Sequence, residues 1–98
     1  MKINFSATLL DLKNEPIKDG KDDATLGSVA AFCLLQRYPD EASLSAADSV
    51  RRFKLAVKVT NGGEQELDVE EVAEIKKLVA KAYAPLVIGR VFEIIDPN

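Results

Sequence analysis

Residues 67–95 read LDVEEVAEIKKLVAKAYAPLVIGRVFEII and carry the strongest structural signals in the chain. Asp68 is followed three residues later by Glu71, which is the spacing of a capping box, and Leu67 and Val72 have the spacing of a hydrophobic staple. Acidic residues come first in this stretch and lysines follow, as the helix macrodipole favours. The segment therefore predicts a helix that begins at Asp68. Its apolar stripe comprises Val72, Ile75, Val79 and Ala82.

Pro85 divides this stretch into two helices, because proline suits the first turn of a new helix. The second helix, which Asp96, Pro97 and Asn98 end, is apolar around much of its circumference. Gly89 in its middle costs about 1 kcal/mol relative to alanine, so we expect another backbone to approach closely there. The helix carries more apolar surface than a small helix pair needs. The predicted interface comprises Leu86, Val87, Gly89, Val91, Phe92 and Ile95.

The N-terminal part alternates between apolar and polar residues. Ile3, Phe5, Ala7 and Leu9 fall on one side, which predicts a half-buried strand over residues 2–12. A turn at 13–15 and a short return strand at 16–18 complete an antiparallel hairpin. Residues 64–67 are short and extended, and they could add a third strand.

Two further helices are predicted between these parts. Thr25 can cap the first helix, which we expect to end near Tyr38 because Pro39 disfavours helix in the residue before it. Ser45 can cap the second helix, and the pair Gly62–Gly63 ends it. For its buried face we expect Ala46, Val50, Phe53 and Val57. Residues 1–98 thus predict one α+β domain, an antiparallel hairpin packed on about four helices.

The composition is that of an ordinary globular protein. The 98 residues are 47% apolar and 30% charged, with a net charge of −3 and a single cysteine. One cysteine allows no internal disulfide, and nothing suggests an oxidising compartment. We see neither the continuous apolar segment of a signal peptide nor an apolar run that could cross a bilayer. We therefore expect a cytoplasmic protein without membrane contact.

No residue pattern indicates catalysis or a cofactor. The chain has no histidine, so Cys33 lacks its usual activating partner, and it is expected to be a small buried hydrophobic residue. Asp19, Asp22 and Asp23 lack the spacing of a calcium loop. A glycine-rich phosphate loop is also missing. We expect no catalytic residue, no metal ligand, no cofactor and no enzymatic activity.

A basic stripe is the remaining feature of interest. Residues 45–61 carry four positive groups and one negative group, a local charge of +3. The stripe is either a solvated helix face or a phosphate-contacting surface, although the net charge of −3 argues against nucleic-acid binding. A helix-turn-helix over 68–95 would offer only Arg90 as a strong base reader. The candidate nucleic-acid residues are Arg51, Arg52, Lys54 and Lys58.

Several short segments resemble a family of small uncharacterised proteins encoded by tailed bacteriophages and prophages. They are Lys76-Lys77-Leu78-Val79, Lys81-Ala82-Tyr83, Pro85-Leu86-Val87 with Gly89, and, nearer the start, Met1-Lys2-Ile3, Pro16-Ile17 and Thr25-Leu26-Gly27. The resemblance implies a phage or prophage accessory protein in the cytoplasm of a bacterial host. It implies no activity and transfers no site residue.

These features predict a non-enzymatic protein that acts through protein–protein interaction. The predicted contact surface is the apolar C-terminal helix, which would make a homodimer or bind a phage or host protein. The alternative is a nucleic-acid-associated regulator that uses the basic stripe.

Overall fold

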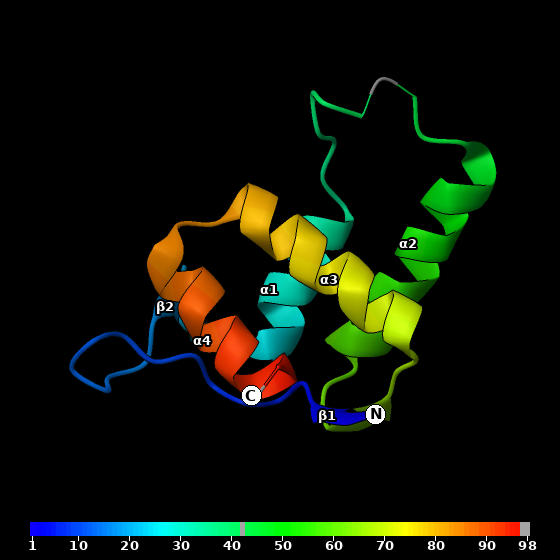
Figure 1. The fold of residues 1–98 in the computed structure, drawn as a ribbon. Helices are drawn as coiled ribbons and strands as arrows, with labels where there is room; N and C mark the ends of the chain where they lie inside the picture. The colour runs from blue at the N-terminus through cyan, green and yellow to red at the C-terminus, as the bar shows by residue number, and fades with distance from the viewer. Residues whose placement is uncertain (42, 97–98) are drawn as a thin grey trace.

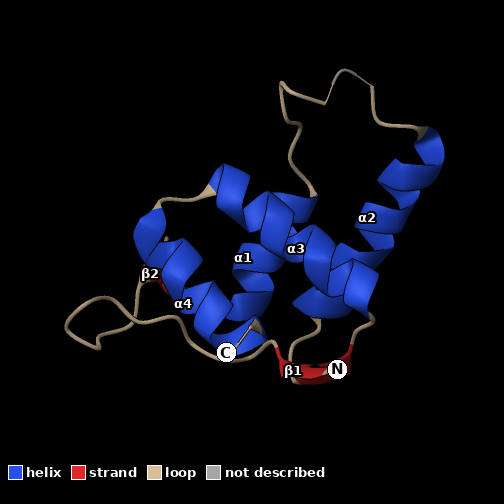
Figure 2. Ribbon diagram, viewed as in Figure 1, coloured by secondary structure: helices blue, strands red, loops and turns tan. Residues whose placement is uncertain are grey.

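The computed structural model describes residues 1–41 and 43–96, and over these residues the chain forms four helices and four short strands (Figures 1 and 2). The predicted α+β class is therefore confirmed. Of the predicted stop signal for the last helix, Pro97 and Asn98 lie outside the described residues. The elements are β1 (Lys2–Asn4), β2 (Lys18–Asp19), β3 (Asp22–Asp23), α1 (Leu26–Leu34), α2 (Ala46–Thr60), β4 (Glu64–Glu66), α3 (Val69–Ala82) and α4 (Pro85–Ile95).

The strands form two separate antiparallel pairs. β1 pairs with β4, with Ile3 opposite Gln65, so the predicted third strand exists and lies beside the start of the chain. β2 and β3 form the hairpin. The predicted pairing of residues 2–12 with 16–18 is present but short. It consists of one antiparallel bridge between Leu10 and Pro16, with backbone hydrogen bonds from the Ile17 amide to Leu9 and from the Asp11 amide to Glu15.

Local polar contacts explain why β1 is shorter than the alternation predicted. The Ser6 amide donates to Asn4 Oδ1 at 3.0 Å, and the Ala7 amide donates to the Asn4 carbonyl at 3.3 Å. Such contacts draw the backbone into a turn in place of a ladder. Phe5 and Leu9 are nevertheless buried, as predicted. The alternation thus identified the buried side of this segment correctly, but not its hydrogen-bond partners.

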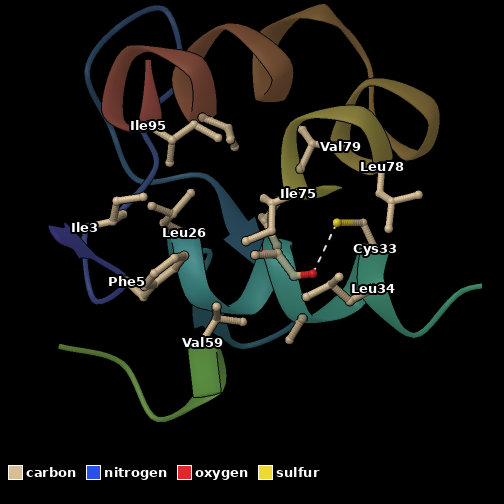
Figure 3. Packing of buried hydrophobic residues seen from close by; sticks show 14 of the residues in the cluster. Ile3, Phe5, Leu26, Cys33, Leu34, Val59, Ile75, Leu78, Val79 and Ile95 are labelled. Atoms are coloured by element: carbon tan, nitrogen blue, oxygen red, sulfur yellow. Dashed lines mark hydrogen bonds between the residues drawn. The ribbon is translucent and has the colours of Figure 1, made fainter. Parts of the chain in front are cut away.

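α1 lies at the centre of the molecule and packs against both α2 and α3, while α4 packs against α3 (Figure 1). Side chains from several elements converge on one core, among them Ile3 of β1, Leu26 of α1, Ile75 of α3 and Ile95 of α4 (Figure 3). α2 and α3 therefore bury part of their apolar side chains against α1, and α4 is linked to α1 through α3.

The helix starts follow the predicted caps. The side chains of Thr25, Ser45 and Asp68 each accept a hydrogen bond from the backbone amide three residues later. Asp68 and Glu71 complete the predicted capping box, and Pro85 opens α4. These signals are local in sequence, so they are read reliably from the residues alone.

α1 ends at Leu34, four residues before the predicted boundary near Tyr38. The Tyr38 hydroxyl donates to the Cys33 carbonyl at 2.6 Å. A side chain thus satisfies a carbonyl that would otherwise lack a partner at the helix end. This contact needs Tyr38 outside the helix, which explains the earlier end.

Gly27 is where α1 and α2 come closest. A Cβ atom at this position would lie 2.5 Å from the Val59 carbonyl oxygen and 2.9 Å from that of Phe5. Gly89, by contrast, has nothing within 4 Å of its would-be Cβ, so the close backbone approach expected at α4 does not occur among the described residues.

The two glycines give a matched test of this packing. We expect Gly27→Ala to lower the free energy of unfolding by about 2 kcal/mol, because overpacking a tight contact costs roughly 1–3 kcal/mol. Gly89→Ala should raise it by about 0.5–1 kcal/mol, since alanine loses less backbone freedom in a helix interior. Urea unfolding at neutral pH measures both changes. Similar effects of the two substitutions would contradict the assignment of the close contact to Gly27.

Candidate interaction surface

α4 uses most of its apolar side chains inside its own domain. Val91 is 0% exposed and Ile95 is 1% exposed, so both belong to the core and leave the predicted interface. Val87 and Phe92 are half-buried and pack against that core. Of the predicted interface residues, Leu86 keeps an exposed apolar side chain, with 36% exposure. The surplus apolar surface expected at α4 is therefore largely absent, because these side chains pack on the core, beside α3 and the N-terminal segment.

α2, in contrast, leaves its predicted buried face in solvent. Val50, Phe53 and Val57 are 50%, 58% and 48% exposed, and Ala46 is also exposed. The residues that α2 buries instead are Arg52, Leu55, Ala56 and Val59. The prediction of the buried face was thus wrong. We call Val50, Phe53 and Val57 the α2 stripe.

The close approach to Gly27 uses the face of α2 that carries Ala56 and Val59. Ala56 is small and Val59 presents its carbonyl oxygen to Gly27, so the two helix backbones can approach closely. A Phe53 side chain in the same contact would hold the helices apart and reduce packing density. Leu55, Ala56 and Val59 also have helical spacing, so the sequence does contain this second apolar face.

Arg52, a candidate nucleic-acid residue, is 4% exposed. Its guanidinium donates to both Glu41 carboxylate oxygens at 2.9 and 2.6 Å, and its Nε donates to Glu74 at 2.7 Å. The bonds to Glu41, with a further contribution from Glu74, raise the pKa of Arg52 above its ordinary value. The Arg52 guanidinium is buried and bound to two carboxylates, so it cannot contact phosphate. Arg52 is therefore not part of an exposed basic surface.

The other three basic residues border the α2 stripe and are accessible. Arg51 Nη2 lies 3.5 Å from Asp48 Oδ1. Lys58 Nζ lies 3.6 Å from Glu71 Oε1 and donates to the Glu66 carbonyl. Lys54 is exposed and makes no ion pair with any residue that the structure describes. We call Arg51, Lys54 and Lys58 the basic flank. Exposed pairs such as Arg51–Asp48 are weak, so Arg51 and Lys54 remain open to a partner, whereas the Lys58 ammonium is held by Glu71 and the Glu66 carbonyl.

A hollow of about 750 Å³ lies between the 35–44 loop and the N-terminal half of α2, and its lining includes Leu34, Leu44 and Arg52. The polar groups best placed to hold a ligand there are the Arg52 guanidinium and the Glu41 carboxylate. These two groups already satisfy each other, and the other charged side chain in the lining, Arg37, is a single exposed cation that does not by itself select a ligand. We therefore do not assign it a binding role.

Cys33 is fully buried, as expected from the sequence. Its thiol donates to the Ala30 carbonyl at 3.1 Å (dashed line in Figure 3), and burial raises its pKa to about 12. At neutral pH the nucleophilic thiolate is therefore negligible. Within residues 1–41 and 43–96, no three histidine, cysteine or acidic side chains gather as a metal site. Asp23 instead forms an ion pair with Lys18.

Arg90, the expected base reader of a helix-turn-helix, has a structural role. Its guanidinium donates to the carbonyl oxygens of Leu10 and Asp11 at 2.9 and 2.8 Å. These bonds attach the N-terminal segment to α4. A guanidinium used in this way is not free to read a base edge.

Comparison with known proteins adds no assignment, because no family model, curated protein or solved structure matches this chain. None of the helices in the described part of the chain is both long and apolar enough to span a bilayer. The function must therefore be inferred from the surface itself.

Arg52 can be tested against its neighbour Arg51. Removing one member of a buried ion pair costs about 3–5 kcal/mol. Since the Glu41 and Glu74 side chains keep 16% and 18% exposure, we expect the lower end, about 3 kcal/mol, for Arg52→Met. Arg51→Met removes an exposed pair and should cost less than about 0.5 kcal/mol. Urea unfolding compares the two, and equal losses would contradict the role assigned to Arg52.

The same cluster predicts a pH dependence. The Arg52 guanidinium lowers the pKa of Glu41 below its ordinary value of 4.5. A carboxyl with a lowered folded-state pKa contributes its full stability above the unfolded value and loses it as pH falls through the folded value. The stability advantage of the wild type over Arg52→Met should therefore be constant near neutral pH and shrink below about pH 4.5. A difference that stays constant down to pH 3 would exclude this coupling.

Proposed function

We propose that this protein is a non-enzymatic interaction protein that binds a segment of another protein through the α2 stripe. The observation that carries the proposal is the exposure of Val50, Phe53 and Val57 on one side of a helix whose other side is core. Single exposed apolar residues are common on protein surfaces. Three in helical register form a continuous apolar line, which is the kind of surface that a partner covers.

A different protein is a better occupant than a second copy of this chain. An antiparallel two-fold contact between two α2 helices would place the two basic flanks side by side, and like charges across an interface are unfavourable. This repulsion favours a heterologous partner over the homodimer that the sequence suggested.

The resemblance of residues 75–95 to phage and prophage proteins supplies the proposed setting. In that setting the protein is an accessory protein in the cytoplasm of a bacterial host, and its partner is a phage or host protein. Nucleic-acid binding receives less support, because Arg52 is buried and the chain carries a net charge of −3.

Photo-crosslinking in the bacterium that carries the gene tests the proposal. We expect benzoylphenylalanine at position 53 to give one discrete adduct with another protein. The same group at Leu12, which is 85% exposed and far from α2 in sequence, should give none. The purified adduct partner should then bind the wild type and Leu12→Asp but not Phe53→Asp.

Phe53→Asp should keep the wild-type stability within about 0.5 kcal/mol, because position 53 is on the surface. Loss of binding would then report the contact and not the fold. The proposal fails if position 53 gives no adduct, or if its adduct has twice the mass of this chain.

A further inference from the structure

We propose that the segment that covers the α2 stripe is an acidic amphipathic helix. This inference rests on the proposed function and names the chemistry of the partner. It starts from the placement of charge on α2, which carries four basic residues and one acidic residue, Asp48. Three of those basic residues lie along one edge of the stripe.

Lys54 is the centre of this basic edge. It follows Val50 by four residues and precedes Val57 by three, so it adjoins both stripe residues on the helix surface. Arg51 and Lys58 lie three residues before and four residues after Lys54, and they extend the same edge in both directions. The Lys58 ammonium is held by Glu71 and the Glu66 carbonyl, and Arg51 makes a weak exposed pair with Asp48. A partner seated on the stripe therefore lies beside two accessible cations, those of Lys54 and Arg51.

The opposite edge of the stripe has no charge. Ser49 precedes Phe53 by four residues, Thr60 follows Val57 by three, and both are exposed. A helix that lies flat on an anionic bilayer usually carries basic residues along its polar face and is attracted by its charge. Here the cations border one edge alone and the whole chain is acidic. This arrangement favours a protein partner with carboxylates on one side over a lipid surface.

The shape of the stripe favours a helical partner. Val50 and Val57 are separated by seven residues, which corresponds to about 10 Å along a helix axis. A straight ridge of this kind fits the groove between side-chain rows of a second helix. An amphipathic helix with apolar residues at intervals of three and four would cover the ridge, and glutamates on one side would face Lys54.

Two synthetic peptides test the charge and the shape together. Both are alanine-rich helices of about 18 residues, or five turns, with leucines at intervals of three and four. The acidic peptide carries glutamates beside the leucines, and the basic peptide carries lysines at the same positions. Fluorescence anisotropy with the full chain at low salt should show binding of the acidic peptide at least ~10-fold tighter than that of the basic one. Added salt should weaken the acidic complex.

Two variants separate the apolar contact from the charge. Phe53→Asp should abolish binding of both peptides. Lys54→Glu keeps the stripe intact and should reduce or reverse the preference for the acidic peptide, whereas Lys18→Glu, far from α2 in sequence, should leave it unchanged. Circular dichroism establishes that each variant is folded.

The outcomes distinguish this inference from the proposed function. Equal binding of the two peptides, lost with Phe53→Asp, would overturn the acidic partner and leave docking on the stripe in place. Binding of neither peptide would also overturn the inference, and the crosslink at position 53 would then decide the proposed function separately. Stripe-dependent binding to phosphatidylglycerol vesicles, or self-association that Phe53→Asp abolishes, would overturn both.

Discussion

The close contact between α1 and α2 at Gly27 determines the rest of the surface. The Gly27 amide donates to the Phe5 carbonyl at 2.8 Å, and the Val59 carbonyl occupies the space where a side chain would begin. α2 reaches this position with the side that carries Leu55, Ala56 and Val59 facing inward. Its other apolar side, the α2 stripe, is therefore turned to solvent. The candidate interaction surface is thus a direct consequence of how the core is packed.

The sequence predicted the features that depend on neighbouring residues. Thr25, Ser45 and Asp68 act as helix caps, and Pro85 opens α4, because each of these signals operates within one helical turn. The burial of Phe5 and Leu9 followed from the alternation alone. The strand that pairs with β1 could not be identified in this way. Its residues lie about sixty positions further along the chain, and they leave no local pattern in the sequence of β1.

The exposed apolar side chains were expected on α4 and are found on α2 for a related reason. α2 has two apolar sides. The periodicity of the sequence identifies both, but it does not indicate which of them is buried. Arg52 was assigned to the basic stripe, yet it shares a side of the helix with Leu55 and Val59, and this spacing was a visible sign that it faces the core. Recognising it as buried required the positions of Glu41 and Glu74, which come from two other segments. The sequence likewise did not reveal that the apolar side chains of α4 would be covered by the core, beside α3 and the N-terminal segment.

The pairing of β1 with β4 also bears on how the chain is made. Ile3 meets Gln65 across the sheet, so this contact cannot form until residues 64–66 have left the ribosome. At about 5–20 residues per second, translation delays that moment by several seconds. During this interval Ile3 and Phe5 have no β4 against which to fold. Ile3 and Phe5 are therefore synthesised well before they can reach their final positions, and the nascent chain passes through a stage in which these apolar side chains are open to chaperones.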